Sequence, residues 1–191
     1  MHISSEGHTP QTLRNLVNIF AAHEDQLFKA FVVTDKRLKR YCKKTEEGFL
    51  KVLNKQKTMT FEQFADIWYE TNGNAGLRDD RYNSSRYHAL NLHSLFDPNR
   101  YKTIELRLGQ WTEETSFNWV VLESFIQIGL AMNNLALTVK TASAKRQKDW
   151  TSAYSFRCWL LRLGFIGDST KEARKFLLQS FEGEKAWRRV A

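Results

Sequence analysis

One short stretch in the middle of the chain, TIELRL, alternates apolar and polar residues, and this alternation constrains the fold more than any other feature. Successive side chains of a β-strand point to opposite faces of the sheet. Ile104 and Leu106 therefore fall on one face of this strand, and Glu105 and Arg107 fall on the other. The pattern predicts a strand with one face in the core and one polar face.

A second strand candidate precedes this one. The strands are expected at residues 86 to 94 and 101 to 109, and the segment FDPNR between them has turn chemistry. The two segments together predict an antiparallel hairpin at residues 86 to 109. An isolated hairpin is only marginally stable in water, so we expect further strands to complete the sheet.

Helical patterns surround the hairpin. A helix is expected from Thr9, which caps it and is followed by a proline, and two more begin at the caps Thr45 and Thr60. From about residue 115 to 191 the chain is predicted to be helical again. The chain is thus predicted to be a single α+β domain over residues 1 to 191, in which helices cover a small antiparallel sheet.

Composition narrows the class of protein. Cys42 and Cys158 stand far apart in the sequence, as in a reduced, intracellular protein with buried thiols. The opening MHISSEGHTP has neither the basic nor the apolar part of a signal peptide. The most apolar segment, near residues 118 to 137, carries one glutamate and several amides, which favours a buried helix over a membrane span. We expect a cytoplasmic protein without a membrane partner.

The polar face of the hairpin is the main candidate site. Antiparallel pairing would bring Asn91 beside Glu105 and Arg107, whereas Arg86 has the wrong parity and could join only from the entering loop or past a bulge. A carboxylate offers oxygen ligands for Mg²⁺, and a guanidinium grips phosphate or carboxylate oxygens. An ordinary ion pair on a solvated sheet would give the same pattern.

The formal net charge of +8 raises the alternative of a nucleic-acid partner. The basic residues form mild clusters at 35 to 44, 144 to 148 and 187 to 189, without a recognisable binding module. A basic surface on an ordinary globular protein explains them better. The second hypothesis is therefore a non-catalytic basic helical module that binds nucleic acid or a protein partner through the first two clusters.

The full string RYHALNLHSL…YKTIELRLGQW resembles the C-terminal signature of the putative amidoligase family, in which an R-Y-x-x-L-N strand precedes a T-[IV]-E-[FL]-R strand. The tail from residue 159, WLLRLGFIGDSTKEARKFLLQSFEGEKAWR, and the opening MHIS are similar to other parts of that family. The resemblance covers nearly all of the chain. It implies a fold and chemistry related to glutamine synthetase and glutamate–cysteine ligase.

The resemblance implies ATP-dependent joining of a carboxylate to an amine through an acyl phosphate, with ATP and Mg²⁺ as cofactors. Small-molecule or peptide carboxylates and amines are the implied substrates. The metal ligands would be Glu105 and, less securely, His2. No glycine-rich phosphate loop is present, so ATP would lie on the sheet face.

The remaining roles also follow from the resemblance. Arg107 would contact phosphate or the acyl phosphate, and Arg86 would be a second contact to phosphate or substrate. Asn91 would position a ligand. Arg81, which like Arg86 precedes a tyrosine, competes with Arg86 for its role.

One departure from the family is large. Its early strands, with a G-x-E-x-E-type metal and nucleotide motif, have no counterpart in the sequence. We therefore expect an incomplete domain: a truncated or split enzyme that needs a missing N-terminal half or a homo-oligomer, or a remnant without activity.

Other residues are expected to be structural. His88 and His93 have no clear metal partners and are interpreted as ordinary polar residues at the sheet. Trp68, Trp119 and Trp159 stand at apolar helical positions and are predicted to lie in the core.

Overall fold

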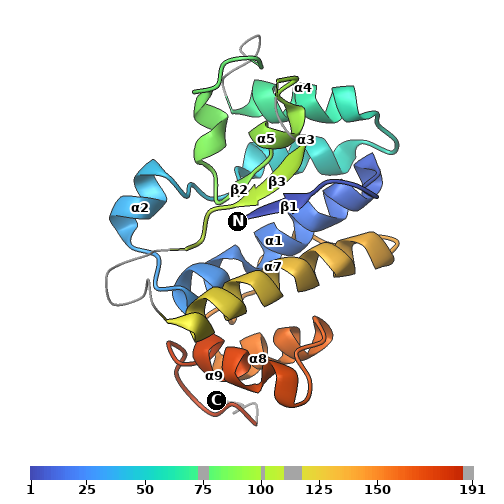
Figure 1. The fold of residues 1–191 in the computed structure, drawn as a ribbon. Helices are drawn as coiled ribbons and strands as arrows, with labels where there is room; N and C mark the ends of the chain where they lie inside the picture. Colours follow the sequence, from blue (N-terminus) through green and yellow to red (C-terminus); the bar gives the residue numbers. More distant parts are fainter. Residues whose placement is uncertain (73–77, 100–101, 110–117, 187–191) are drawn as a thin grey trace.

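The computed structural model describes residues 1–72, 78–99, 102–109 and 118–186. Within these ranges the predicted class is confirmed: helices surround a small antiparallel sheet (Figure 1).

The sheet has three strands, in the order β1-β3-β2. The central strand β3 (Thr103–Leu106) confirms the middle of the strand expected at 101 to 109, of which residue 101 lies outside the described ranges. Strand β2 (Leu90–Asn91) pairs with one edge of β3, and β1 (His2–Ser4) pairs with the other. The further strand that the hairpin needs thus comes from this chain, more than 90 residues before β3.

The prediction of a long first strand at residues 86 to 94 is wrong. Its beginning belongs to the 3₁₀ helix η1 (Ser84–Tyr87), and its end belongs to the short helix α5 (His93–Phe96). Two asparagines redirect the backbone, since the side-chain oxygens of Asn83 and Asn91 each accept a hydrogen bond from the backbone N–H two residues on. Such local bonds compete with strand pairing.

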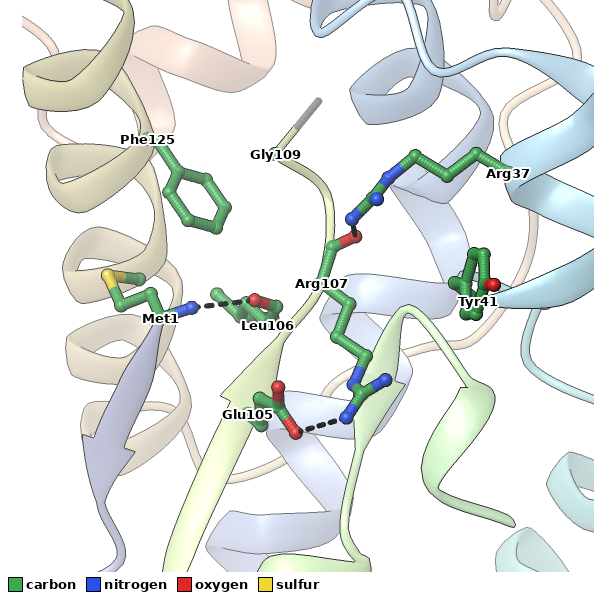
Figure 2. Close-up of a pocket in the computed structure, with 8 residues that line it drawn as sticks. All are labelled: Met1, Arg37, Tyr41, Glu105, Leu106, Arg107, Gly109 and Phe125. Atoms are coloured by element: carbon green, nitrogen blue, oxygen red, sulfur yellow. Dashed lines mark hydrogen bonds and ion pairs between the residues drawn. The ribbon is translucent and has the colours of Figure 1, made fainter. Parts of the chain in front are cut away.

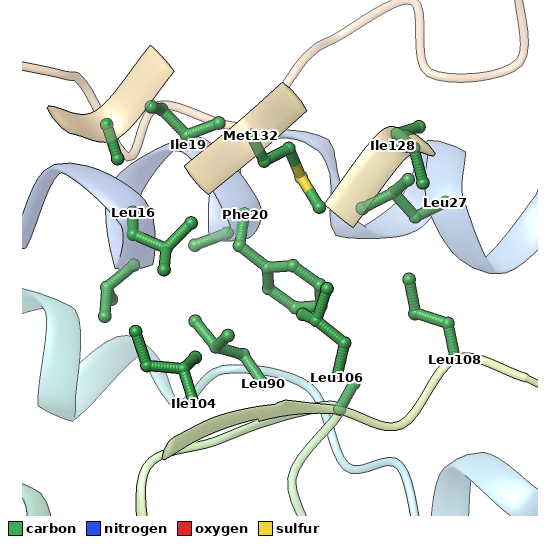
Figure 3. Packing of buried hydrophobic residues seen from close by; sticks show 14 of the residues in the cluster. Leu16, Ile19, Phe20, Leu27, Leu90, Ile104, Leu106, Leu108, Ile128 and Met132 are labelled. Atoms are coloured by element: carbon green, nitrogen blue, oxygen red, sulfur yellow. The ribbon is translucent and has the colours of Figure 1, made fainter. Parts of the chain in front are cut away.

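Two long helices cover the apolar face of the sheet. Helix α1 (Pro10–Ala30) begins as predicted, because the Thr9 side chain accepts a hydrogen bond from the third residue of the helix. Helix α7 (Trp119–Thr138) packs against α1 and the sheet (Figure 1). Buried side chains from the three elements interlock in Figure 3: Leu16, Phe20, Ile104, Leu106, Ile128 and Met132.

Helix α7 is buried on one side only. It is the one helix in the described ranges long and apolar enough to cross a membrane, and helices in the cores of soluble proteins share this length and composition. Of its most apolar window 39% is buried, and Leu130 is half exposed. The prediction of a core position is confirmed for Trp68 and Trp159 but wrong for Trp119, which is 78% exposed at the start of the helix.

The other helices complete the fold at its two ends. Helices α3 (Glu47–Lys55) and α4 (Phe61–Thr71) pack on each other beyond the sheet, α9 (Lys171–Leu177) packs against the far side of α7, and α2 (Asp35–Arg40) stands apart (Figure 1). Thr60 caps α4 as predicted, but Glu46 rather than Thr45 precedes α3, because Thr45 bonds to the buried Glu24. The fold also contains α8 (Ala153–Arg162) and η2 (Asp168–Thr170).

Gly129 in α7 allows the sheet to approach the helix. A Cβ atom at this position would overlap the Met1 side chain and lie 2.9 Å from Leu106 Cδ1 in the core. We expect Gly129→Ala to lower the free energy of unfolding by about 1–2 kcal/mol, because overpacking outweighs the gain in helix propensity. Chemical denaturation measures this change.

Gly48→Ala in α3 is the matched control for that substitution. A Cβ at Gly48 meets nothing within 4 Å, so alanine there is expected to raise stability by about 0.5–1 kcal/mol. Equal stabilisation by both substitutions would contradict the close approach of sheet and helix at Gly129.

Candidate active site

A row of polar side chains crosses the sheet at the level of Glu105. In the strand register Glu105 pairs with His2 on one side and with Asn91 on the other. Directly paired residues point to the same face of a sheet, so the three side chains lie side by side. The neighbours Ile104 and Leu106 turn into the core, as the alternation predicts.

Hydrogen bonds fix this carboxylate. Asn91 Nδ2 donates to Glu105 Oε2 at 2.7 Å, and Arg107 Nη2 donates to the same oxygen at 3.0 Å. His2 Nε2 lies 3.8 Å from the other oxygen, Oε1, and His2 Nδ1 lies 2.8 Å from Thr103 Oγ1. The predicted cluster of Asn91, Glu105 and Arg107 is thus present, with His2 at its exposed edge.

The surroundings keep Glu105 ionised. Burial alone would raise the pKa of this carboxyl, but the Asn91 bond, the charge and hydrogen bond of Arg107 and the charge of His2 together lower it below its ordinary value. The side chains of Glu105 and Arg107 are 16% and 15% exposed. The site therefore holds a fixed, partly buried anion beside a fixed cation at neutral pH.

The cluster opens into a pocket of about 360 Å³ between β3, α2 and α7 (Figure 2). In Figure 2 the end of β3, with Glu105 and Arg107, lies between Phe125 of α7 on one side and the pair Arg37 and Tyr41, on and just after α2, on the other. Arg37 and Tyr41 were not among the predicted site residues. In the sequence both belong to the basic run at 35 to 44, which indicated only a charged surface.

Neither of the two other arginines of the prediction lines the described part of the pocket. Arg86 lies in η1 and donates a hydrogen bond to the backbone oxygen of Arg81, and its guanidinium and that of Arg107 each lie 5.8 Å from the centroid of the Tyr87 ring. Arg81 lies farther along the chain, over the exposed Tyr82 ring at 5.9 Å. Within the described ranges no hydrogen bond or ion pair joins either arginine to Glu105.

Two histidines, expected to flank the sheet as ordinary polar residues, lie on either side of β2 in the chain, and both are buried. His88 and His93 are 5% and 1% exposed. His88 Nδ1 bonds to the backbone oxygen of Ser85, and His93 Nδ1 to the Tyr69 hydroxyl. Hydrogen-bond partners of this kind allow a polar ring to be buried.

The donor set fits one kind of metal site and not another. Among the residues that the structure describes, no three His, Cys, Asp or Glu side chains gather closely enough to hold a metal ion. An all-protein cage is therefore not formed by these residues. Mg²⁺ commonly binds through one or two carboxylates, with water and substrate phosphates as its other ligands. Glu105 fits that arrangement.

Comparison with known proteins gives one match. A family model described as putative amidoligase enzyme matches residues 1–123, which include all three strands, α2 and most residues around the pocket. The resemblance of the tail from residue 159 lies beyond this match and stays a prediction. No curated protein and no solved structure matches the chain.

Proposed function

The chain belongs to the putative amidoligase enzyme family, whose model spans well over half of it, and from this premise we propose that it joins a carboxylate to an amine at the expense of ATP. The observation that carries the proposal is the ionised Glu105 held beside Arg107 at the mouth of an open pocket. A fixed anion and a fixed cation suit a reaction in which a metal–phosphate group must be held and its charge stabilised.

The proposed reaction has two steps. The substrate carboxylate attacks the γ-phosphorus of ATP and releases ADP, which leaves an acyl phosphate. The amine then attacks the acyl carbon, and phosphate and a proton leave. Small-molecule and peptide carboxylates both fit this chemistry.

Arg107 is proposed to stabilise the phosphoryl oxygens in both steps, since its planar guanidinium can donate two parallel bonds to an oxyanion. Arg86 is proposed as a second phosphate or substrate contact. It is favoured over Arg81 because it shares the Tyr87 ring with Arg107.

Glu105 is proposed to hold Mg²⁺, which would neutralise the charge of the nucleotide phosphates. Asn91 orients the carboxylate through its bond to Oε2, leaving Oε1 towards His2. Imidazole nitrogen suits transition metals better than Mg²⁺, so His2 is proposed as a neighbour of the ion rather than a strong ligand.

Further carboxylates are proposed to come from a second polypeptide or a second copy of the chain, since Glu105 is the one acid in the described part of the pocket. Turnover per chain would then rise with protein concentration. The abundance of Mg²⁺ and ATP inside cells fits a cytoplasmic protein.

Ion pairs take up part of the positive charge on which the alternative of a nucleic-acid module depends. Arg146 of the second cluster pairs with Glu24 and Asp25, and Lys44 of the first cluster also pairs with Asp25. These cations are already neutralised. The third cluster, at 187 to 189, lies outside the described residues.

Trapping with hydroxylamine tests the proposal. An acyl phosphate reacts with hydroxylamine to give a hydroxamate, which is measured as its coloured iron complex. With Mg²⁺, ATP and a panel of amino-acid and dipeptide carboxylates, we expect hydroxamate and ADP to form in equal amounts from at least one substrate.

Two controls decide the result. Leaving out Mg²⁺ should stop both products. ADP release without hydroxamate from any carboxylate would point to simple ATP hydrolysis, and the absence of both products at all protein concentrations would contradict the proposed function.

A further inference from the structure

Arg37 is the pocket residue whose position the fold explains least. It lies in the middle of α2, a six-residue helix with no buried residues, and extends back towards the end of β3 (Figure 2). Its Nη2 atom lies 3.4 Å from the backbone oxygen of Arg107. Holding a long, charged side chain in this way costs conformational entropy.

This contact, together with one to the Cys42 thiol, is a poor reason for the placement. A distance of 3.4 Å is at the long end for a hydrogen bond, and the same carbonyl oxygen already accepts a bond from the Cys42 thiol. Burial raises the pKa of this thiol, so Cys42 is neutral at pH 7 and brings no charge to Arg37. Neither neighbour balances the guanidinium.

The pocket as described has too little negative charge. Arg37 forms no ion pair with any acid in the described ranges, and its Nε atom is buried without a hydrogen-bond partner. The Nε atom of Arg107 is in the same condition. Glu105, the one carboxylate among the described pocket residues, is shared among Asn91, Arg107 and His2. Two guanidinium groups thus border a space to which the described residues bring a single, already committed anion.

We propose that Arg37 and Arg107 form an oxyanion subsite that binds a phosphate or carboxylate group between β3 and α2. The shared chemistry is a planar or tetrahedral oxyanion, supplied by the nucleotide phosphates or by the substrate carboxylate. The choice of these two sources as ligands rests on the proposed function. The subsite itself depends only on the charges and contacts of the pocket.

The size of the pocket agrees with this assignment. A volume of about 360 Å³ is at the lower end of the range for small-ligand sites and exceeds the needs of a single phosphate group. Tyr41, which is 44% exposed, lines the same side as Arg37 and offers a hydroxyl to a ligand there.

Calorimetric titration with inorganic pyrophosphate, and separately with L-glutamate, tests the subsite in the absence of Mg²⁺ and ATP. About 0.15 M salt suppresses attraction to distant charges. We expect Arg37→Gln to weaken binding of at least one probe by about tenfold to a hundredfold, as for the loss of a charged hydrogen bond. Arg40→Gln is the matched control, since Arg40 is an exposed arginine of the same helix outside the pocket.

The outcomes distinguish phosphate from carboxylate as the ligand and test whether binding depends on Arg37. Loss of pyrophosphate binding in Arg37→Gln assigns the subsite to phosphate, and loss of glutamate binding assigns it to a carboxylate. Equal losses in Arg37→Gln and Arg40→Gln, or no binding of either probe by the unaltered chain, would overturn the subsite. Arg37-dependent binding in a protein that forms no hydroxamate would keep the subsite and remove the ligase function.

Discussion

Glu105→Gln is expected to lower Mg²⁺- and ATP-dependent turnover at least about a hundredfold. Glutamine can still accept the bonds from Asn91 and Arg107, so the geometry of the cluster is largely kept. The negative charge is lost, and with it the one carboxylate that the described residues of the pocket offer to a metal ion. The measurement is the initial rate of hydroxamate or ADP formation at saturating ATP.

Stability must be followed in the same experiment. Loss of the carboxylate leaves Arg107, which is 15% exposed, without its counter-ion, and we expect unfolding to become easier by about 1–2 kcal/mol. Glu70→Gln, an exposed position on α4, is the matched control and should retain full turnover. Full turnover by a folded Glu105→Gln protein would remove Glu105 from the proposed mechanism.

Glu24→Ala is expected to produce the largest loss of stability, about 3–5 kcal/mol, measured by chemical denaturation. Glu24 is fully buried in α1 and accepts bonds from the backbone N–H and hydroxyl of Thr45 and from Arg146. Its removal would leave the buried Thr45 donors without an acceptor. The segments that contain Thr45 and Arg146 would both lose their bonds to this position of α1. A loss of this size is a large share of the stability of a typical domain.

Asp25→Ala is the matched control for Glu24. Asp25 is the next residue and lies 3.6 Å from the same Arg146, but it is partly exposed, so its loss should cost less than about 1 kcal/mol. Similar losses for the two substitutions would contradict a special role for the buried carboxylate.

The sign of the pH dependence at Glu24 follows from burial. Burial raises the pKa of this carboxyl, although the bonds to Thr45 and Arg146 oppose the shift. The stability from this group is therefore complete below the ordinary carboxyl pKa and declines as the pH rises through the raised value. Glutamine does not titrate, so Glu24→Gln should not show this decline of stability with rising pH.

The polar face of the sheet could be predicted from the sequence because strand alternation is a local rule. It placed Ile104 and Leu106 in the core and Glu105 beside Arg107, and one antiparallel pairing added Asn91. The place of His2 depended on a strand of three residues, which is too short to show a period. The family resemblance named His2 as a candidate, but its place beside Glu105 follows only from the pairing of β1 with β3, about a hundred residues away.

The errors have equally specific causes. Asn83 and Asn91 read as residues of a loop and a strand, but their side chains bond to the backbone and end the strand early. Arg37 was hidden in a basic run, because charge alone does not show that one arginine of six cations turns inward. Packing against β3 decides that.

The central claim is that this pocket binds Mg²⁺-ATP through Glu105 and its neighbouring arginines. The most direct measurement is a calorimetric titration of Mg²⁺-ATP into the 191-residue chain, with Glu105→Gln alongside. The account predicts saturable binding that requires Mg²⁺ and is lost in the variant. A chain that is folded by circular dichroism and binds no ATP, or binds it equally well in the variant, would contradict the account.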